Sequence, residues 1–259
     1  LIIMGNSLRK IKVDDSGSKF VYGYKCSTNV ISRTNLRTGS EVTVQVSYVF
    51  LTASTWVEHP TKLYFTGGRD YSQFSSDVRS LDLLKDFAAI ALPDMSQGKA
   101  LHGCVLYNDC LYIIGGTDMR QDFNDCERLI LNENRWENLQ PLPICAHFVS
   151  AIVHEPTHSI YSASSATIAQ NAARSHHFHK LNLTTLNWET LEVQVSAFKL
   201  PFVWATFNDK AKLFLVRGKV VYAFDTEHFR VTKFKSLTYH FTKYNGPLRL
   251  YESSLYCPS

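Results

Sequence analysis

The chain has 259 residues, of which 45% are hydrophobic, 19% charged and 13% aromatic. This composition is typical of a globular protein whose aromatic side chains are half buried in packed sheets. The formal net charge is only +4, and no run of basic residues exceeds two. The concentrated basic stripe of a nucleic-acid-binding protein is therefore missing.

The sequence contains no stretch of about 20 apolar residues, so it predicts no membrane-spanning helix. Six cysteines are present, and none of them forms a Cys-x-x-Cys pair, which argues against a zinc or redox motif. We therefore expect reduced, mostly structural thiols and a cytoplasmic location. Because the sequence begins at Leu1 without a signal-peptide pattern, we also expect it to be a piece of a longer protein.

A short hydrophobic segment, which in several copies ends in small residues, recurs along the chain. Its copies are Phe20–Tyr24, Leu63–Gly68, Leu111–Gly116, Ile160–Ser165, Leu213–Gly218 and Leu255–Cys257. They begin at residues 20, 63, 111, 160, 213 and 255, so successive copies are 42 to 53 residues apart. Double glycine ends the copies at Gly67-Gly68 and Gly115-Gly116, whereas Ser164-Ser165 and Arg217-Gly218 stand in later copies.

A hairpin precedes the third copy. Leu101–Tyr107 reads as a strand, and Asn108-Asp109 is a dipeptide typical of two-residue turns. Such a turn pairs Tyr107 with Cys110 and Cys104 with Ile113. The two sulfur atoms are then not cross-strand partners, so no disulfide is expected between them.

The second half of each unit also repeats. After a polar loop, a third strand leads to a fourth, which begins with Trp or Phe in four of the five units. These strand pairs are Val30–Arg33 with Val42–Val46, Asp77–Leu81 with Phe87–Pro93, Arg128–Leu131 with Trp136–Pro141, His177–Leu181 with Trp188–Leu191, and Val220–Asp225 with Phe229–Phe234. Units of about 40–50 residues with four strands each are typical of propeller blades.

These residues resemble the kelch repeat, in which a hydrophobic strand runs into Gly-Gly and is followed by a polar loop, a strand and a Trp. The resemblance implies an all-β, kelch-type β-propeller. We expect a single domain over residues 1–259 with six blades of four antiparallel strands, that is, five full units and a partial closing blade. The blades are expected at about 8–47, 49–93, 100–143, 147–193, 200–235 and 238–259, the last completed by residues 1–7. A five-bladed ring is the alternative.

Motifs with a chemical meaning are few. His154-Glu155-Pro156-Thr157-His158 matches the zinc-protease pattern, but that chemistry needs a helix and Pro156 would break it. We expect a hairpin turn there, with no metal and no cofactor. His177 and His179 should share one face of a strand.

The resemblance implies a non-enzymatic protein–protein interaction module that recognises a peptide or protein. The module would act as a substrate receptor of a ubiquitin ligase, with ubiquitin-ligase or cytoskeletal components as partners and without nucleic acid or membrane. A sugar-binding or carbohydrate-active propeller enzyme is the first alternative, and an actin-associated binding protein is the second.

Binding is expected on one end of the propeller. Labelling the strands of a blade a to d from the centre outward, the b–c loops and the d–a segments between blades emerge on the same end, and loops on a rigid scaffold carry function. The predicted partner-binding residues are Arg69, Asp70, Tyr71, Phe74, Asp118, Arg120, Phe123, His147, Asn171 and Arg174. Arginine with aromatic side chains is typical of interfaces. The open alternative is that Phe74 and Phe123 fold back over their blades and that the arginines are only solvated.

Overall fold

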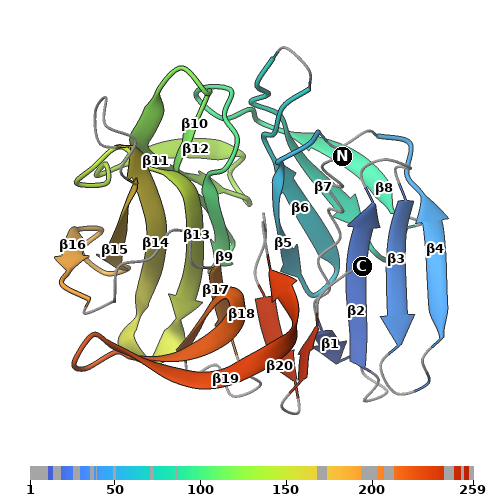
Figure 1. Ribbon diagram of the computed structural model, residues 1–259. Coiled ribbons are helices and arrows are strands. Elements are labelled where there is room, and N and C mark those ends of the chain that lie inside the picture. The colour runs from blue at the N-terminus through green and yellow to red at the C-terminus, as the bar shows by residue number, and fades with distance from the viewer. Residues whose placement is uncertain are drawn as a thin grey trace.

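The computed structural model of the chain is built from β-strands, with one 3-10 turn among the residues it describes. The described residues are 11–13, 19–25, 30–35, 38, 40–48, 51–70, 73–85, 87–167, 174–193, 203–206, 213–241, 248–251 and 254–256. In this part of the chain, 21 strands form five sheets (Figure 1).

Four of the sheets have four strands each, in chain order. Sheet 1 consists of β1 (Ile11–Val13), β2 (Lys19–Lys25), β3 (Val30–Asn35) and β4 (Glu41–Gln45). Sheet 2 consists of β5 (Thr55–His59), β6 (Lys62–Thr66), β7 (Val78–Asp82) and β8 (Ala88–Leu92). Sheet 3 consists of β9 (Gly103–Tyr107), β10 (Cys110–Thr117), β11 (Asp122–Ile130) and β12 (Arg135–Leu139). Sheet 4 consists of β13 (His147–His154), β14 (Ser159–Thr167), β15 (Arg174–Asn182) and β16 (Trp188–Leu191).

Neighbouring strands within these four sheets are antiparallel, and the predicted register of the hairpin at Asn108-Asp109 is confirmed. Cys110 pairs with Tyr107 and Ile113 pairs with Cys104. Asn108 and Asp109 have φ values of 46° and 55°, the left-handed region that a two-residue hairpin turn with the native twist requires.

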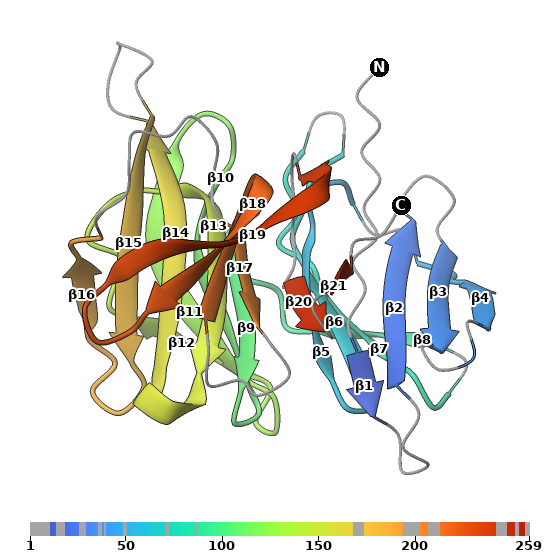
Figure 2. The same cartoon turned by 60° about the horizontal axis from the view of Figure 1, so that its bottom comes forward.

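The first strands of sheets 2 to 5 lie side by side near the centre. β9 contacts β5 on one side and β13 on the other, and β13 also contacts β17 (Val203–Thr206), which is the corresponding strand of sheet 5. The later strands of each sheet extend outward from these inner strands (Figures 1 and 2). The expected all-β, kelch-type propeller architecture is confirmed by this arrangement.

Hydrophobic side chains fill the space between neighbouring sheets. Leu111 and Ile113 of sheet 3 pack with Val57 and Tyr64 of sheet 2. On the opposite face of sheet 3, Tyr112 and Ile114 belong to a cluster that also contains side chains of sheet 4. Sheet 3 therefore buries both faces, and since one blade alone leaves both exposed, its stability depends on its neighbours.

Sheet 5 departs from the expected blade. Its strand order is β19-β18-β17-β20-β21, where β18 is Leu213–Asp225, β19 is Arg230–Phe241, β20 is Leu248–Tyr251 and β21 is Ser254–Tyr256. The expected second and third strands, 213–218 and 220–225, form the single strand β18. Only Lys219 separates them, and one residue is too short to reverse the chain direction.

The expected sixth blade is represented by the hairpin of β20 and β21. It is not a separate sheet, because β20 pairs in parallel with β17 through Ala205 and Leu248. The described part of the chain thus contains five sheets, which is the number expected for the five-bladed alternative. The strand expected at residues 1–5 lies outside the described residues.

Two further sequence predictions concern membrane spans and thiols. Within the described ranges no helix is long and apolar enough to cross a bilayer. The four cysteines that lie in those ranges, Cys104, Cys110, Cys126 and Cys145, are free thiols.

Candidate functional site

The double glycines create the turns from which the b–c loops of sheets 2 and 3 leave their blades. Gly67 and Gly115 have φ values of 56° and 57°, and Gly68 and Gly116 have 104° and 113°. Residues that carry a side chain rarely adopt this backbone conformation. A Cβ atom on Gly67 would also lie 2.4 Å from the carbonyl oxygen of Lys99. Glycine is therefore required both for the turn and for the close approach of the next d–a segment.

Backbone hydrogen bonds then join the b–c loops and the d–a segments into one continuous layer. Gly68 donates its N–H to the carbonyl of Lys99 at 3.0 Å, and Gly116 donates to Ala146 at 2.9 Å. Ala100 and Thr117 exchange two bonds of 3.0 Å. The loops of sheets 2 and 3 are thus fixed to the segments on both sides of them, which makes this end of the molecule a connected surface.

The tips of these two loops have the same local structure. Asp70 Oδ1 accepts the N–H of Gln73 at 2.8 Å, and Asp118 Oδ1 accepts the N–H of Gln121 at 2.9 Å. In both loops the Asp N–H also donates to the carbonyl of that same Gln. Such Asp side chains hold a tight turn, and the bonds from Gln121 and Arg120 lower the pKa of Asp118. The shared Asp-x-x-Gln spacing shows that the two tips are equivalent.

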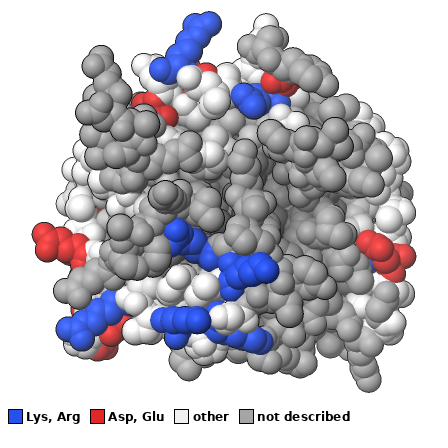
Figure 3. All heavy atoms as spheres, in the orientation of Figure 1, with Lys and Arg blue, Asp and Glu red and all other residues white. Residues whose placement is uncertain are grey.

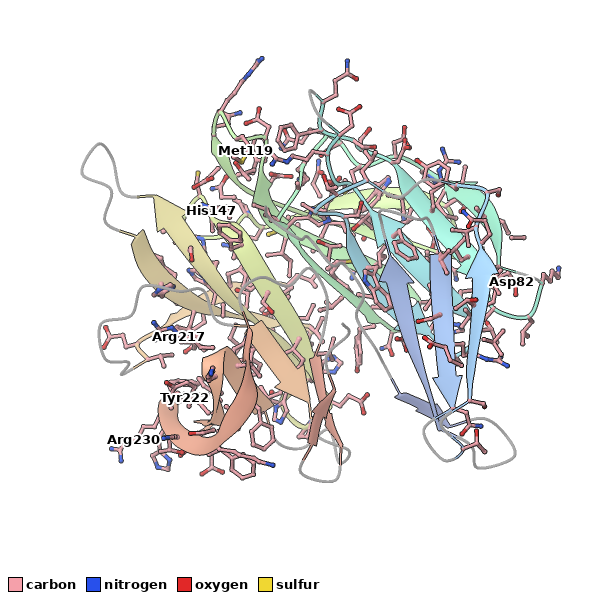
Figure 4. All side chains as sticks on the ribbon, turned by 45° about the vertical axis from the view of Figure 1, so that its right-hand side comes forward. Asp82, Met119, His147, Arg217, Tyr222 and Arg230 are labelled. Carbon is pink, nitrogen blue, oxygen red and sulfur yellow. The ribbon has the colours of Figure 1, made fainter. Side chains whose placement is uncertain are left out.

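The tip of sheet 3 projects Met119 and Arg120. Met119 is 63% exposed, Arg120 is exposed, and Figure 4 shows Met119 at the outer end of its loop. A flexible apolar side chain next to a guanidinium is a combination that suits protein contacts, because Met adapts to irregular surfaces and Arg is enriched at interfaces.

A buried ionic group lies beneath the tips. Lys99 is fully buried, and its ammonium contacts the carboxylate of Asp125 and lies 3.6 Å from Oε1 of Glu127. Ser96 donates its backbone N–H and its hydroxyl to Glu127, each at 3.2 Å. The ring of Phe123 lies 5.7 Å from the Lys99 ammonium. The network fixes the d–a segment between sheets 2 and 3 to β11.

A second polar pair joins sheets 3 and 4. His147 Nδ1 lies 2.7 Å from Oδ2 of Asp122, and the His147 ring packs against Phe148 with 4.9 Å between centroids. His147 is buried and lies at the start of β13 (Figure 4). It therefore supports the loop layer from within.

The structure places the predicted partner-binding residues at three depths. Asp70 and Arg120 are exposed, and Arg69, Phe74 and Asp118 are half buried. Phe123 and His147 are buried, so the alternative that Phe123 covers its blade holds in this structure. Arg174 begins β15. Tyr71 and Asn171 lie outside the described residues.

Two residues of the same layer were not among the predicted partner-binding set. Met119 and Cys145 are both exposed. The signal for Met119 was present in the sequence, because it occupies the position in Asp-x-x-Gln that Tyr71 occupies one unit earlier. Cys145 lies outside the repeated Asp-x-x-Gln pattern, so the sequence contained no comparable signal for it.

The zinc-protease-like segment adopts the predicted turn. Glu155–Thr157 is a short 3-10 turn between β13 and β14, with Pro156 in its first turn. His154 Nδ1 lies 2.8 Å from Oγ1 of Thr157, whereas His158 Nδ1 lies 3.1 Å from Oη of Tyr107. The two histidines thus face different partners. Across the described ranges no three His, Cys, Asp or Glu side chains are grouped as metal ligands.

The histidines of β15 share one face, as predicted. The rings of His177 and His179 stack with 6.3 Å between centroids. Burial, with a contribution from His177, lowers the pKa of His179 to about 4. His179 is therefore neutral near pH 7.

Comparison with protein-family models matches residues 98–143 to the kelch motif. The matched segment contains all of sheet 3, its double glycine and residues 98–102 of the preceding d–a segment. No curated protein matches the chain.

Proposed function

We propose that this chain, which belongs to the kelch-repeat family, is a non-enzymatic protein-interaction module that binds a peptide or protein partner on its b–c/d–a end. The observation that carries the proposal is the continuous layer of backbone hydrogen bonds that holds equivalent loop tips on one surface. A rigid scaffold lowers the entropic cost of binding through such tips.

The exposed chemistry of this end supports a protein partner. Met119 provides apolar contact area, Arg120 provides a planar donor group, and Asp70 and Gln73 provide hydrogen-bonding groups at the neighbouring tip. A small apolar centre with a polar rim is the composition of protein interfaces. Ubiquitin-ligase components and cytoskeletal components are the partner classes that we propose for it.

A pair of matched variants tests the proposal. Met119→Ser/Arg120→Ala removes the apolar and the basic side chain from the tip of sheet 3. Leu84→Ser/Lys85→Ala makes the same kind of change in the turn between β7 and β8, where Leu84 is 75% exposed and Asp82 Oδ1 accepts the Leu84 N–H in a similar turn. Strand direction places this turn on the end opposite the b–c loops.

We expect proteins captured from a cell extract by the wild type to be retained by the Leu84/Lys85 variant and lost from the Met119/Arg120 variant. A photo-crosslinking residue introduced at position 119 should then attach to the captured protein, and one at position 84 should not. Equal capture and equal crosslinking by the two positions would remove the proposed surface.

A further inference from the structure

A long two-stranded ribbon extends from sheet 5. β18 pairs with β17 only through residues 213–216, whereas residues 218–225 pair with β19. β19 is the outermost strand in the order of this sheet, so one of its edges has no neighbouring strand among the described residues. Figures 1 and 2 show the ribbon as a twisted pair that crosses the molecule at the end away from the b–c loops.

One face of the ribbon is fixed against the body of the protein. Phe224 packs with Trp204 at 5.0 Å and with Tyr161 at 5.8 Å between ring centroids. Val231, the partner of Phe224 in the ladder, packs against the same cluster. The ribbon is therefore an ordered surface that is held by aromatic contacts to sheet 4.

The ribbon has an excess of basic over acidic side chains. Residues 213–241 contain five basic and two acidic residues, a net charge of +3 in a chain whose total is +4. The exposed basic side chains are Lys219, Arg230, Lys233 and Lys235. Arg217 and Arg230 are both labelled on the ribbon in Figure 4, and Figure 3 shows basic side chains gathered over this part of the molecule.

The two acidic residues do not neutralise this surface. Asp225 and Glu227 lie at the hairpin turn, and Asp225 Oδ2 is 2.9 Å from Nδ1 of His228. Within the described part of the chain, Lys219 and Lys233 form no ion pair. A positive potential therefore extends along the ribbon away from its turn.

An aromatic side chain lies in the middle of the basic strand. Phe234 is 53% exposed, and its ring centroid is 5.1 Å from that of Phe214. The ladder shifts here, because Tyr222 pairs with Lys233 and Val221 with Lys235. Phe234 is the extra residue of this β-bulge, and bulges commonly redirect a side chain.

Protection against aggregation explains the lysines but not the phenylalanine. Lysines and bulges on an edge strand discourage random strand pairing. A half-exposed aromatic ring on the same edge has the opposite effect, since it adds apolar surface. Aromatic side chains flanked by charge are instead typical of surfaces that bind a chosen partner.

We propose that the ribbon is a second docking surface, and that its occupant is an extended acidic segment of a partner protein lying along β19. Carboxylates of the segment face Lys233 and Arg230, and an apolar side chain of the segment covers Phe234. The open edge of β19 can accept backbone hydrogen bonds from an extended chain. Opposite charge guides the encounter and selects the acidic partner.

Fluorescence anisotropy with a defined probe tests this proposal. The probe is a labelled 12-residue peptide of Glu and Asp residues around one central Trp, and its control has every Glu and Asp replaced by Gln and Asn. Lys233→Glu and Phe234→Ser change the proposed surface. Lys85→Glu changes the net charge by the same amount on an exposed lysine of another sheet.

We expect the acidic probe to bind the wild type and the Lys85→Glu variant equally, with an affinity that falls as salt is raised. Lys233→Glu and Phe234→Ser should each weaken binding by about threefold to tenfold. The neutral probe should bind at least tenfold more weakly than the acidic one. The Met119/Arg120 variant should bind the acidic probe as the wild type does, which separates this surface from the proposed function.

Several results would overturn the proposal. If Lys85→Glu and Lys233→Glu weaken the affinity for the acidic peptide equally, the binding reflects the net charge of the protein and not a site on the ribbon. Lys233-dependent binding to phosphatidylserine vesicles or to a single-stranded oligonucleotide, with no binding of the acidic peptide, would show a different occupant. Absence of peptide binding to the wild type at about 1 mM would reject the site.

Discussion

Trp136 donates its indole N–H to the carbonyl oxygen of Pro93, with 3.0 Å between the two atoms. The residues belong to different sheets, since Trp136 lies in β12 and Pro93 follows β8. The same relationship recurs one unit later, where Trp188 donates to the carbonyl of Gln140 at 2.9 Å. The repeated Trp therefore ties the outer strand of each of these sheets to the end of the preceding one.

Replacing Trp136 with Phe should remove this hydrogen bond while keeping most of the aromatic contact. We expect a loss of about 1 kcal/mol in the free energy of unfolding, the usual net value of one hydrogen bond. Trp136→Ala should cost about 2–4 kcal/mol because the ring is lost as well. Urea unfolding followed by circular dichroism measures both, and a Trp136→Phe variant as stable as the wild type would show that the hydrogen bond contributes nothing.

Two features of position 116 disfavour any residue other than glycine: its positive φ angle and the short distance to a neighbouring side chain. Gly116 has a φ of 113°, and an added Cβ would lie 2.9 Å from Cβ of His102. We expect Gly116→Ala to destabilise the protein by about 2 kcal/mol or more. Ser165→Ala is the matched control, because Ser165 occupies the corresponding position of sheet 4 within a regular strand.

The Ser165→Ala variant should lose only about 1 kcal/mol, from the 3.4 Å contact of its hydroxyl with His176. Thermal melting of the two variants beside the wild type makes the comparison. Equal melting temperatures for Gly116→Ala and the wild type would show that the loop does not need a glycine there.

The buried ion network gives a third prediction. Lys99→Met leaves Glu127 buried without its cation, and we expect a loss of about 3 kcal/mol in unfolding free energy. Arg135→Met is the matched control, because the Arg135–Glu133 pair is 54% and 51% exposed and such pairs contribute about 0–1 kcal/mol.

The double variant Lys99→Met/Glu127→Gln separates burial of a lone charge from loss of packing. We expect it to be more stable than Lys99→Met alone, since the buried Glu127 carboxylate is then neutral and the remaining carboxylate, Asp125, is 35% exposed to water. If the double variant loses as much as the sum of the two single changes, Lys99 and Glu127 are not energetically coupled.

Local signals allowed much of the fold to be predicted. The turn at Asn108-Asp109 fixed the pairing of Cys104 with Ile113, because a two-residue loop leaves only one register. Gly67 and Gly68 marked a backbone turn that only glycine tolerates easily. Both inferences concern residues close in the sequence, where the chain itself restricts the possibilities.

Relations between distant residues could not be predicted in the same way. Lys99 is buried because Asp125 and Glu127 lie beside its ammonium. From the sequence alone, a lysine in a polar segment is expected to be exposed to solvent. The parallel pairing of β20 with β17 joins residues about 40 positions apart. In the candidate site, the depth of Phe123 depends on the neighbouring d–a segment, so the sequence left its two orientations open.

Two buried histidines predict how stability depends on pH. Burial, with the nearby Lys99 charge, lowers the pKa of His102 to about 3, and burial with His177 lowers that of His179 to about 4. In the unfolded chain both groups have a pKa of about 6.5. Between these values the unfolded state binds protons that the folded state does not, so stability is complete above about pH 6.5 and falls as the pH falls toward 4.

The variant His179→Gln isolates one of these contributions. It removes one proton-binding group from the unfolded chain, so below pH 6 its unfolding free energy should fall less steeply than that of the wild type, by about 1.4 kcal/mol per pH unit. At pH 8 both histidines are neutral in both states, so a difference between the proteins there measures packing alone. Urea titrations from pH 8 to pH 4.5 provide the data. Parallel stability curves for the two proteins would mean that His179 takes up its proton equally in the folded and unfolded states, and that its burial between sheets 3 and 4 has no electrostatic cost.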